Sequence, residues 1–327
     1  MNYDEIVKLG EEARARGAFI GRVKSSVGQV VVGQERLVER IIIAFMCGGH
    51  ILLEGLPGLA KTLAVRAFAR SINASFSRIQ FTPDLLPADL VGTRIYNPRE
   101  MDFFTRRGPV FTNILLADEI NRAPAKVQSA LLQAMEERTV TIGEETHELP
   151  CPFMVLATQN PIEQEGTYPL PEAQVDRFFM KCLVDYPEKD EERQILARLE
   201  TIDAERVTPV VGPGEILEGA RLAEGIHVDE TLMDYIVGLV RETRAPGDKR
   251  CARFIEFGAS PRASIALLRA ARTLAFMRGR GYVTPDDIRE VGTDVLRHRI
   301  ILTYEAEAER VKSDDAVKMI FDSVEVP

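Results

Sequence analysis

Apolar and polar residues follow two different patterns along the chain, one on each side of residue 187. Before it, short apolar runs bounded by turn residues predict buried strands, at 51–54, 76–81, 114–118, 153–158 and 180–184. Helical spacing of apolar residues between these strands predicts helices, at 61–72 and 124–138. Strands that alternate with helices in this way predict a parallel sheet covered by helices on both faces.

After residue 184 the strand pattern stops and helical periodicity takes over, at 230–243, 261–278 and 285–296. The last helix has a clear start signal, because Thr284 can act as N-cap and Pro285 follows at the first helical position. We therefore expect three parts: an N-terminal helical segment (1–30), an α/β core of αβα layers (31–186) and a smaller all-helical domain (187–327).

Two stretches of the predicted core do not fit a minimal sheet. Residues 93–96 and 102–105 flank an Asn-Pro turn, and residues 139–142 and 146–149 flank Gly143. Such pairs of short strand patterns around a turn are typical of β-hairpins inserted into the core. The alternative is two long surface loops.

The first strand leads into residues 55–62 (Gly-Leu-Pro-Gly-Leu-Ala-Lys-Thr), which come close to the phosphate-binding pattern Gly-x₄-Gly-Lys-Ser/Thr. Small residues and a helix N-terminus leave backbone N–H groups free to face a triphosphate. Lys61 is the expected charge for the β- and γ-phosphates, and Thr62 the expected hydroxyl ligand of Mg²⁺. The predicted nucleotide-binding residues are Gly55, Pro57, Gly58, Leu59, Ala60, Lys61, Thr62 and Leu63.

One position departs from that pattern, since Ala60 stands where the second glycine belongs. Alanine is tolerated there if its φ is negative, so the departure weakens the motif without breaking it. The alternative interpretation is an ordinary strand–turn–helix corner.

A phosphate loop needs a carboxylate at the end of a neighbouring strand, and residues 114–119 (Ile-Leu-Leu-Ala-Asp-Glu) supply two. Asp118 is the expected ligand of Mg²⁺, directly or through water. Glu119 is placed to polarise the water that attacks the γ-phosphate. The next strand ends at Asn160, which can position that water or simply form an Asn-Pro turn. Arg177 precedes the last strand, where a lone arginine is usually solvated or salt-bridged.

The net charge and the cysteine content indicate which partners and which cellular location to expect. The chain has 327 residues, with 41 Lys+Arg against 50 Asp+Glu and a net charge of −9. An acidic surface repels phosphate backbones, so we expect no nucleic-acid partner. Four cysteines far apart indicate reduced thiols, and neither a signal peptide nor a bilayer-length apolar run is apparent. We expect a cytoplasmic protein without membrane insertion.

Together, four motifs resemble the MoxR family of AAA+ ATPases. They are residues 55–62, 118–123 (Asp-Glu-Ile-Asn-Arg-Ala), 157–161 (Ala-Thr-Gln-Asn-Pro) and 171–178. The resemblance spans about residues 30 to 310 and accounts for Ala60, because the family's own loop has alanine before lysine. It implies an AAA+ P-loop fold with a helical lid domain, in which the two hairpins are insertions characteristic of this branch.

The resemblance also implies roles for further residues. Asn160 matches the first sensor, Arg177 the arginine finger that reaches a neighbour's nucleotide, and Arg262 the second sensor on the lid. Adenine is expected at Val32, Gly33 and Gln34. Arg122 stays open: it can order the site or join the subunit interface.

By the same resemblance, the expected activity is Mg²⁺-dependent ATP hydrolysis by a homo-oligomeric ring, a hexamer, that remodels partner proteins. Family members often work with partners that carry a von Willebrand factor A domain. Two alternatives remain: an AAA+ motor or chelatase subunit, and a nucleotide-governed binding switch that hydrolyses slowly.

Overall fold

The computed structural model describes residues 2–161 and 166–327, and their contacts group them into two compact units. The sheet unit comprises Arg22–Phe178 and Cys182–Pro213. The helical unit comprises the chain from its N-terminus to Gly21, Phe179–Lys181 and Gly214–Pro327. Each unit is described by itself below.

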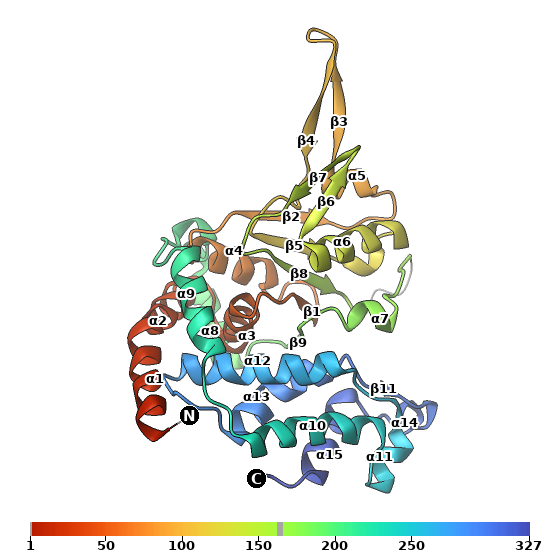
Figure 1. Cartoon of the computed structure of the whole chain (residues 1–327). Coiled ribbons are helices and arrows are strands. Elements are labelled where there is room, and N and C mark those ends of the chain that lie inside the picture. The colour runs from red at the N-terminus through yellow and green to blue at the C-terminus, as the bar shows by residue number, and fades with distance from the viewer. Residues whose placement is uncertain (1, 162–165) are drawn as a thin grey trace. The chain divides into compact units, whose positions relative to one another are not determined.

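The centre of the sheet unit is a five-stranded sheet in the order β2-β5-β8-β1-β9 (Figure 1). Its strands are β1 (Ile51–Gly55), β2 (Phe76–Gln80), β5 (Ile114–Asp118), β8 (Met154–Gln159) and β9 (Met180–Val184). The pairs β1–β8, β2–β5 and β5–β8 are parallel. The predicted strands are therefore confirmed to within one residue at each end. β2 lies at one edge. β8 lies between β1, which leads into the phosphate loop, and β5, which ends at the two acids.

Helices cover the sheet on both faces, as the alternating pattern predicts. On one face, α5 (Pro87–Val91) and α6 (Ala125–Glu137) pack against a core that includes Leu115 and Val155. α4 (Lys61–Ser71) packs against β2 and β5. α3 (Glu35–Met46) packs on α4, with an edge-to-face contact of Phe45 with Phe68 at 5.5 Å. The interior strands β5, β8 and β1 are apolar up to their carboxyl ends because both of their faces are buried there.

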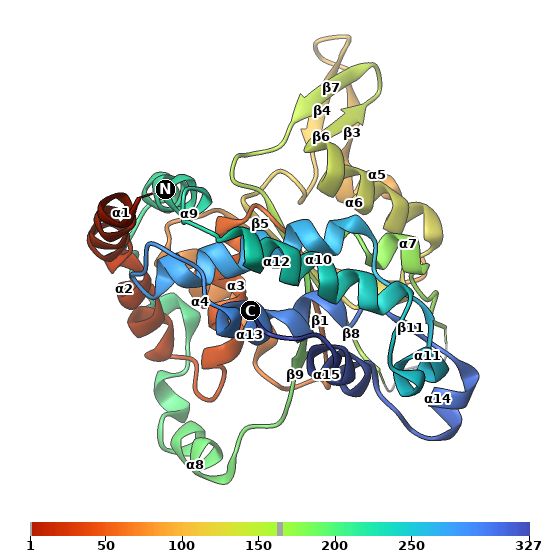
Figure 2. The ribbon, with the colours of Figure 1, turned by 60° about the horizontal axis from the view of Figure 1, so that its bottom comes forward.

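The two inserted hairpins are confirmed. One pairs β3 (Gly92–Asn97) with β4 (Asp102–Arg107), and the other pairs β6 (Thr139–Ile142) with β7 (Glu145–Glu148). Both views show the longer β3–β4 hairpin standing away from the sheet with the β6–β7 hairpin near its base (Figures 1 and 2). Large apolar side chains are exposed on the longer hairpin, at Tyr96, Met101, Phe103 and Phe104.

The contacts divide the chain differently from the expected boundaries at 30 and 186. Residues 187–213, with α8 (Lys189–Ala197), η2 (Leu199–Thr201) and η3 (Ala204–Arg206), group with the sheet. The physical reason is a set of contacts with α4, in which Glu205 pairs with Arg66 and Arg70 and the Val210 N–H donates to the Ser71 carbonyl.

The helical unit is built mainly from helices, with α1 from the N-terminus among them. The helices are α1 (Tyr3–Arg16), α9 (Pro213–Glu224), α10 (Glu230–Arg244), α11 (Lys249–Phe254), α12 (Pro261–Met277), α13 (Pro285–Leu296), α14 (Tyr304–Ala308) and α15 (Ser313–Ser323), while α2 (Ala18–Gly28) crosses the division. α1 packs on α12, and Arg14 donates to the Gly279 carbonyl. A short antiparallel pair, β10 (Ile255–Phe257) and β11 (Ile301–Leu302), corrects the expectation that no strand follows residue 184.

The predicted start of α13 is borne out in detail. Thr284 and Asp287 form a capping box, in which the Thr284 N–H donates to the Asp287 carboxylate at 2.9 Å. Asp287 is fully buried and also pairs with Arg278 and Arg280. These contacts outweigh desolvation, so the pKa of Asp287 lies below its ordinary value although burial by itself raises it.

Candidate nucleotide-binding site

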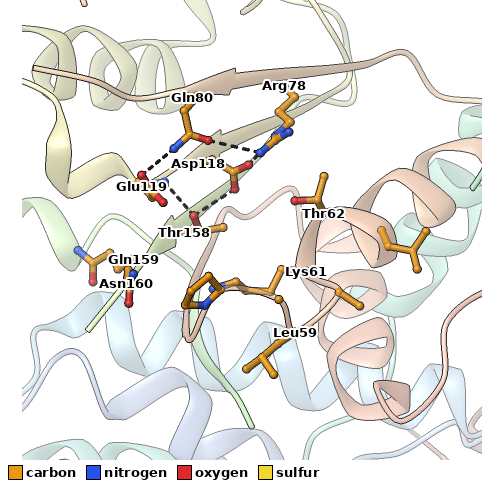
Figure 3. A pocket seen from close by; sticks show the side chains of 14 residues that line it. Leu59, Lys61, Thr62, Arg78, Gln80, Asp118, Glu119, Thr158, Gln159 and Asn160 are labelled. Atoms are coloured by element: carbon orange, nitrogen blue, oxygen red, sulfur yellow. Dashed lines mark hydrogen bonds and ion pairs between the residues drawn. The ribbon is translucent and has the colours of Figure 1, made fainter. Parts of the chain in front are cut away.

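A cavity of about 390 Å³ opens in the sheet unit where the carboxyl ends of β5 and β8 meet the start of α4 (Figure 3). Ligand sites of open parallel sheets occupy this position. The lining residues are Pro57, Gly58, Leu59, Ala60, Lys61, Thr62, Leu63, Arg78, Gln80, Asp118, Glu119, Thr158, Gln159 and Asn160. Four sequence segments far apart in the chain therefore converge on one volume.

The backbone of the phosphate loop explains its small residues. Gly58 has a φ of +86°, which favours glycine. At Gly55 a Cβ would lie 2.6 Å from the Val184 carbonyl oxygen, so the approach of β9 requires a glycine there. Alanine at position 60 was expected to have a negative φ. That requirement is not met, because the φ of Ala60 is +56°, in the left-handed region. Alanine is thus held in a conformation that costs about 1 kcal/mol or more.

The two polar residues that open α4 face the cavity from one side (Figure 3). The Lys61 ammonium donates to the Gly55 carbonyl oxygen at 2.5 Å. Burial lowers the pKa of Lys61 below its ordinary value, while nearby carboxylates, Asp118 first, oppose that shift. A partly desolvated ammonium that donates to a backbone oxygen is suited to meet an anion.

Asp118 is buried at the end of β5, and both of its oxygens accept hydrogen bonds. The Thr158 hydroxyl donates to Oδ1 at 3.2 Å, and the Arg78 Nε donates to Oδ2 at 2.6 Å. Because a buried carboxylate is costly without partners, these contacts offset the cost of its burial.

Glu119 stands in a strained conformation and has three contacts. Its φ is +56° and ψ is +51°, which costs about 1–3 kcal/mol for a residue other than glycine. Its carboxylate accepts from Gln80 Nε2 at 2.7 Å and pairs with Arg122 at 3.1 Å. Its backbone N–H donates to the Thr158 hydroxyl at 2.9 Å. Arg122, whose role the sequence leaves open, therefore contacts Glu119 of its own chain.

The remaining predicted residues divide into those at the cavity and those elsewhere. Asn160 lines the cavity and is buried. Arg177 does not line it and instead pairs with Glu136 of α6 at 2.9 Å. Arg262 lies exposed in the first turn of α12, in the helical unit.

The three residues expected at adenine precede α3 and do not line this cavity. They are Val32, Gly33 and Gln34. Gly33 has a φ of +74°, and a Cβ there would lie 2.6 Å from the Glu191 carboxylate. Contact of this segment with adenine stays a prediction.

Sequence reasoning missed four residues of the cavity: Arg78, Gln80, Thr158 and Gln159. Arg78 and Gln80 lie two residues apart on β2, so they share one face of an edge strand. Polar residues at such positions usually face solvent, so the sequence pattern did not indicate that these two belong to the site. Strand register decides their position, because Gln80 of β2 lies beside Asp118 of β5.

The oxygen atoms of the cavity fit a magnesium ion. The Asp118 carboxylate and the Thr62 hydroxyl line the same cavity, and hard oxygen ligands suit Mg²⁺. Among residues 2–161 and 166–327, no group of three or more His, Cys, Asp and Glu side chains is arranged to hold a metal by itself. This agrees with the usual mode of Mg²⁺ binding, which uses few protein ligands together with phosphates.

Comparison with known proteins decides the family. Residues 50–180 match the family described as "ATPase family associated with various cellular activities (AAA)", and residues 247–320 match "AAA lid domain". Chaperone MoxR1 of Mycobacterium tuberculosis is 50% identical over 304 residues, which cover 92% of this chain and 80% of that protein. The chain belongs to the MoxR family of AAA+ ATPases. The predicted family and fold class are thereby confirmed, and nucleotide binding follows from the family.

Two further proteins match over nearly their whole length. Protein MoxR of Methylorubrum extorquens is 31% identical over 332 residues, covering 94% of each chain. The crystal structure of a protein from Cytophaga hutchinsonii has a TM-score of 0.92 and 48% identity, covering 99% of each chain. In the part of the MoxR chain that the structure describes, no helix has both the length and the apolar character that crossing a bilayer requires.

Proposed function

We propose that this MoxR protein hydrolyses ATP with Mg²⁺ and works as a hexameric ring that remodels partner proteins. One observation carries the ATPase part of this proposal: the phosphate loop, Asp118, Glu119 and Asn160 line a single cavity. Phosphoryl transfer depends almost entirely on positioning and charge stabilisation, and these are the groups that it needs.

Five side chains of the cavity have a proposed task in hydrolysis. Lys61 faces the β- and γ-phosphates as a point charge, and the loop N–H groups of residues 58–62 bind phosphate oxygens. Thr62 and Asp118 would hold Mg²⁺, and the ion would supply positive charge that offsets the charge of the phosphates. Glu119 takes the proton of the attacking water, and Asn160 holds that water in line. General-base help of this kind contributes about 10²–10⁴-fold in rate.

Residues away from the cavity complete the site across subunits and domains. In this proposal Arg177 acts on the nucleotide of a neighbouring subunit, and Arg262 contacts the γ-phosphate from the helical unit. Adenine lies against residues 32–34. The AAA+ fold and membership of the MoxR family support these roles. A single substitution can test each of them directly.

The proposal of a hexameric ring that remodels other proteins rests on the family alone. The Mycobacterium relative is named a chaperone, which supports remodelling of other proteins. A partner with a von Willebrand factor A domain fits this scheme, as does a cytoplasmic location. The net charge of −9 argues against nucleic acid as the client.

A second candidate function, the slow nucleotide-governed switch, is favoured by the contacts of Glu119. Gln80 and Arg122 both hold its carboxylate. A base that is engaged in this way needs a rearrangement before it can take a proton, which keeps basal turnover low. ATP turnover measured with and without a partner protein separates a remodeller from a switch.

The test of the ATPase is Glu119→Gln, with Glu144→Gln as control because Glu144 is exposed in the turn between β6 and β7. The first variant should bind Mg·ATP and lose at least about a hundredfold in turnover, since it lacks the base. The control should match the wild type in both respects. Turnover of Glu119→Gln within about threefold of the wild type excludes Glu119 as the general base.

A further inference from the structure

Arg78 lies in an unusual place for an arginine. Neither the sequence motifs nor the family match assigns it a role. It lies on the edge strand β2 with a side chain that is 51% exposed, yet its Nε contacts the carboxylate of Asp118, whose side chain is only 10% exposed. Figure 3 shows the guanidinium reaching over the cavity to the acid. A buried carboxylate is costly without a partner of opposite charge, and Arg78 forms an ion pair with Asp118.

We propose that Arg78 is the counter-cation of Asp118 in the nucleotide-free protein, and that Mg²⁺ must displace it. Arg78 would thereby set how much Mg²⁺ the site needs before nucleotide binds tightly. This inference rests on the proposed function, because it takes Asp118 as the carboxylate that holds the ion. Arg78 acts through Asp118 and is therefore a positioning residue.

Each oxygen of Asp118 already accepts a hydrogen bond, so an approaching Mg²⁺ meets an occupied carboxylate. Oδ1 accepts from Thr158 and Oδ2 accepts from Arg78, so both are engaged. Thr158 is buried and also accepts a hydrogen bond from the Glu119 N–H, which fixes it in place. Arg78 is half exposed and can move into water, which makes Oδ2 the oxygen that becomes available. Two cations beside one carboxylate oxygen would repel each other.

The experiment measures binding of a fluorescent ADP analogue over a series of free Mg²⁺ concentrations, starting from EDTA. Arg78→Gln removes the competing cation and should lower the half-saturating Mg²⁺ concentration about tenfold or more, the equivalent of one charge-assisted hydrogen bond. Affinity in EDTA should fall by less than about threefold, because only a solvent-screened charge is lost there. The charge-matched control is Arg106→Gln on the exposed strand β4, which should leave the Mg²⁺ requirement unchanged.

Arg78→Lys provides the same comparison if the glutamine variant does not fold. Its strongly hydrated ammonium lacks the planar fork, so it should lower the Mg²⁺ requirement less, in the same direction. An unchanged or raised Mg²⁺ requirement in these variants overturns the proposal, as does an equal shift in Arg106→Gln. Weakening of binding by the same factor with and without Mg²⁺ also overturns it, because Arg78 would then be a phosphate ligand.

Failure of the proposed function has a different signature in the same experiment. A wild-type protein that binds no nucleotide at any Mg²⁺ concentration rejects both ideas. Wild-type binding that tightens with Mg²⁺, together with no shift in Arg78→Gln, rejects the role of Arg78 alone.

Discussion

The imidazole of His50 accepts a hydrogen bond from the backbone N–H of Val155 at 2.9 Å. The ring nitrogen that accepts is Nδ1, so Nε2 carries the proton and donates to the Met135 carbonyl at 3.1 Å. One buried ring thus joins the residue before β1 to β8 and to α6. Burial lowers the pKa of His50 to about 4, which keeps the ring neutral.

This contact predicts a loss of stability in mild acid. The unfolded state takes up a proton at His50 below pH 6.5, whereas the folded state does so only near pH 4. Protonation therefore favours unfolding, and stability falls as the pH is lowered from 6.5 to 4. The share of His50 in the free energy of unfolding is roughly 3 kcal/mol over this window. Urea unfolding between pH 7 and pH 4 measures it.

The matched variant is His50→Gln, whose amide does not titrate. We expect it to be less stable than the wild type at pH 7, with the difference shrinking as the pH approaches 4. Wild-type and variant curves that stay parallel over the whole range would show that His50 does not carry this dependence.

Replacing the lysine of the phosphate loop should abolish nucleotide binding. Lys61→Ala removes the one ammonium that lines the cavity, while leaving the loop backbone intact. Calorimetry with ATP and Mg²⁺ should detect no binding in a folded variant. Lys126→Ala, an exposed lysine of α6, is the control and should bind like the wild type. Near-native affinity in folded Lys61→Ala assigns the loop another role.

The left-handed backbone at Ala60 changes the expected effect of a glycine there. Ala60→Gly relieves strain in the folded state, but it adds about 0.5–1 kcal/mol of entropy to the unfolded chain. The two effects nearly cancel, so thermal stability should change little and nucleotide affinity by less than about tenfold. A larger loss of affinity would mean that the Ala60 methyl group makes a contact on which binding depends.

A site shared between subunits should reveal itself by complementation. Arg177 contacts α6 through Glu136 and the Leu132 carbonyl, and it does not line the cavity of its own chain. Arg177→Ala should therefore bind ATP and fail to hydrolyse it, as Glu119→Gln does. An arginine finger contributes about 10³–10⁵ in rate.

Mixing the two inactive variants should restore ATP turnover. Some interfaces then pair the intact base of one subunit with the intact arginine of its neighbour. The control mixes Arg177→Ala with a chain that carries both substitutions, where no intact arginine exists and no activity should return. If no ATP turnover returns at any ratio of the two single variants, although mass measurement confirms mixed assembly, an arginine that acts between subunits is rejected.

Features that are contiguous in the chain could be predicted from the sequence. The phosphate loop at 55–62 and the acids at 118 and 119 are recognisable because neighbouring residues supply the whole chemical unit. The interior strands β1, β5 and β8 are recognisable because burial on both faces gives each of them a run of apolar residues. The hairpins and the start of α13 carry turn and capping signals of the same local kind.

Relationships across strands had no such signal, and only the tertiary structure decided them. The sequence by itself determined the family, the sheet and the motif residues. Folding decided that Arg78 and Gln80 would reach the two acids, because the parallel register of β2 and β5 brings together residues about 40 positions apart. It also decided the φ of Ala60, since the backbone of a tight loop is set by the elements it joins.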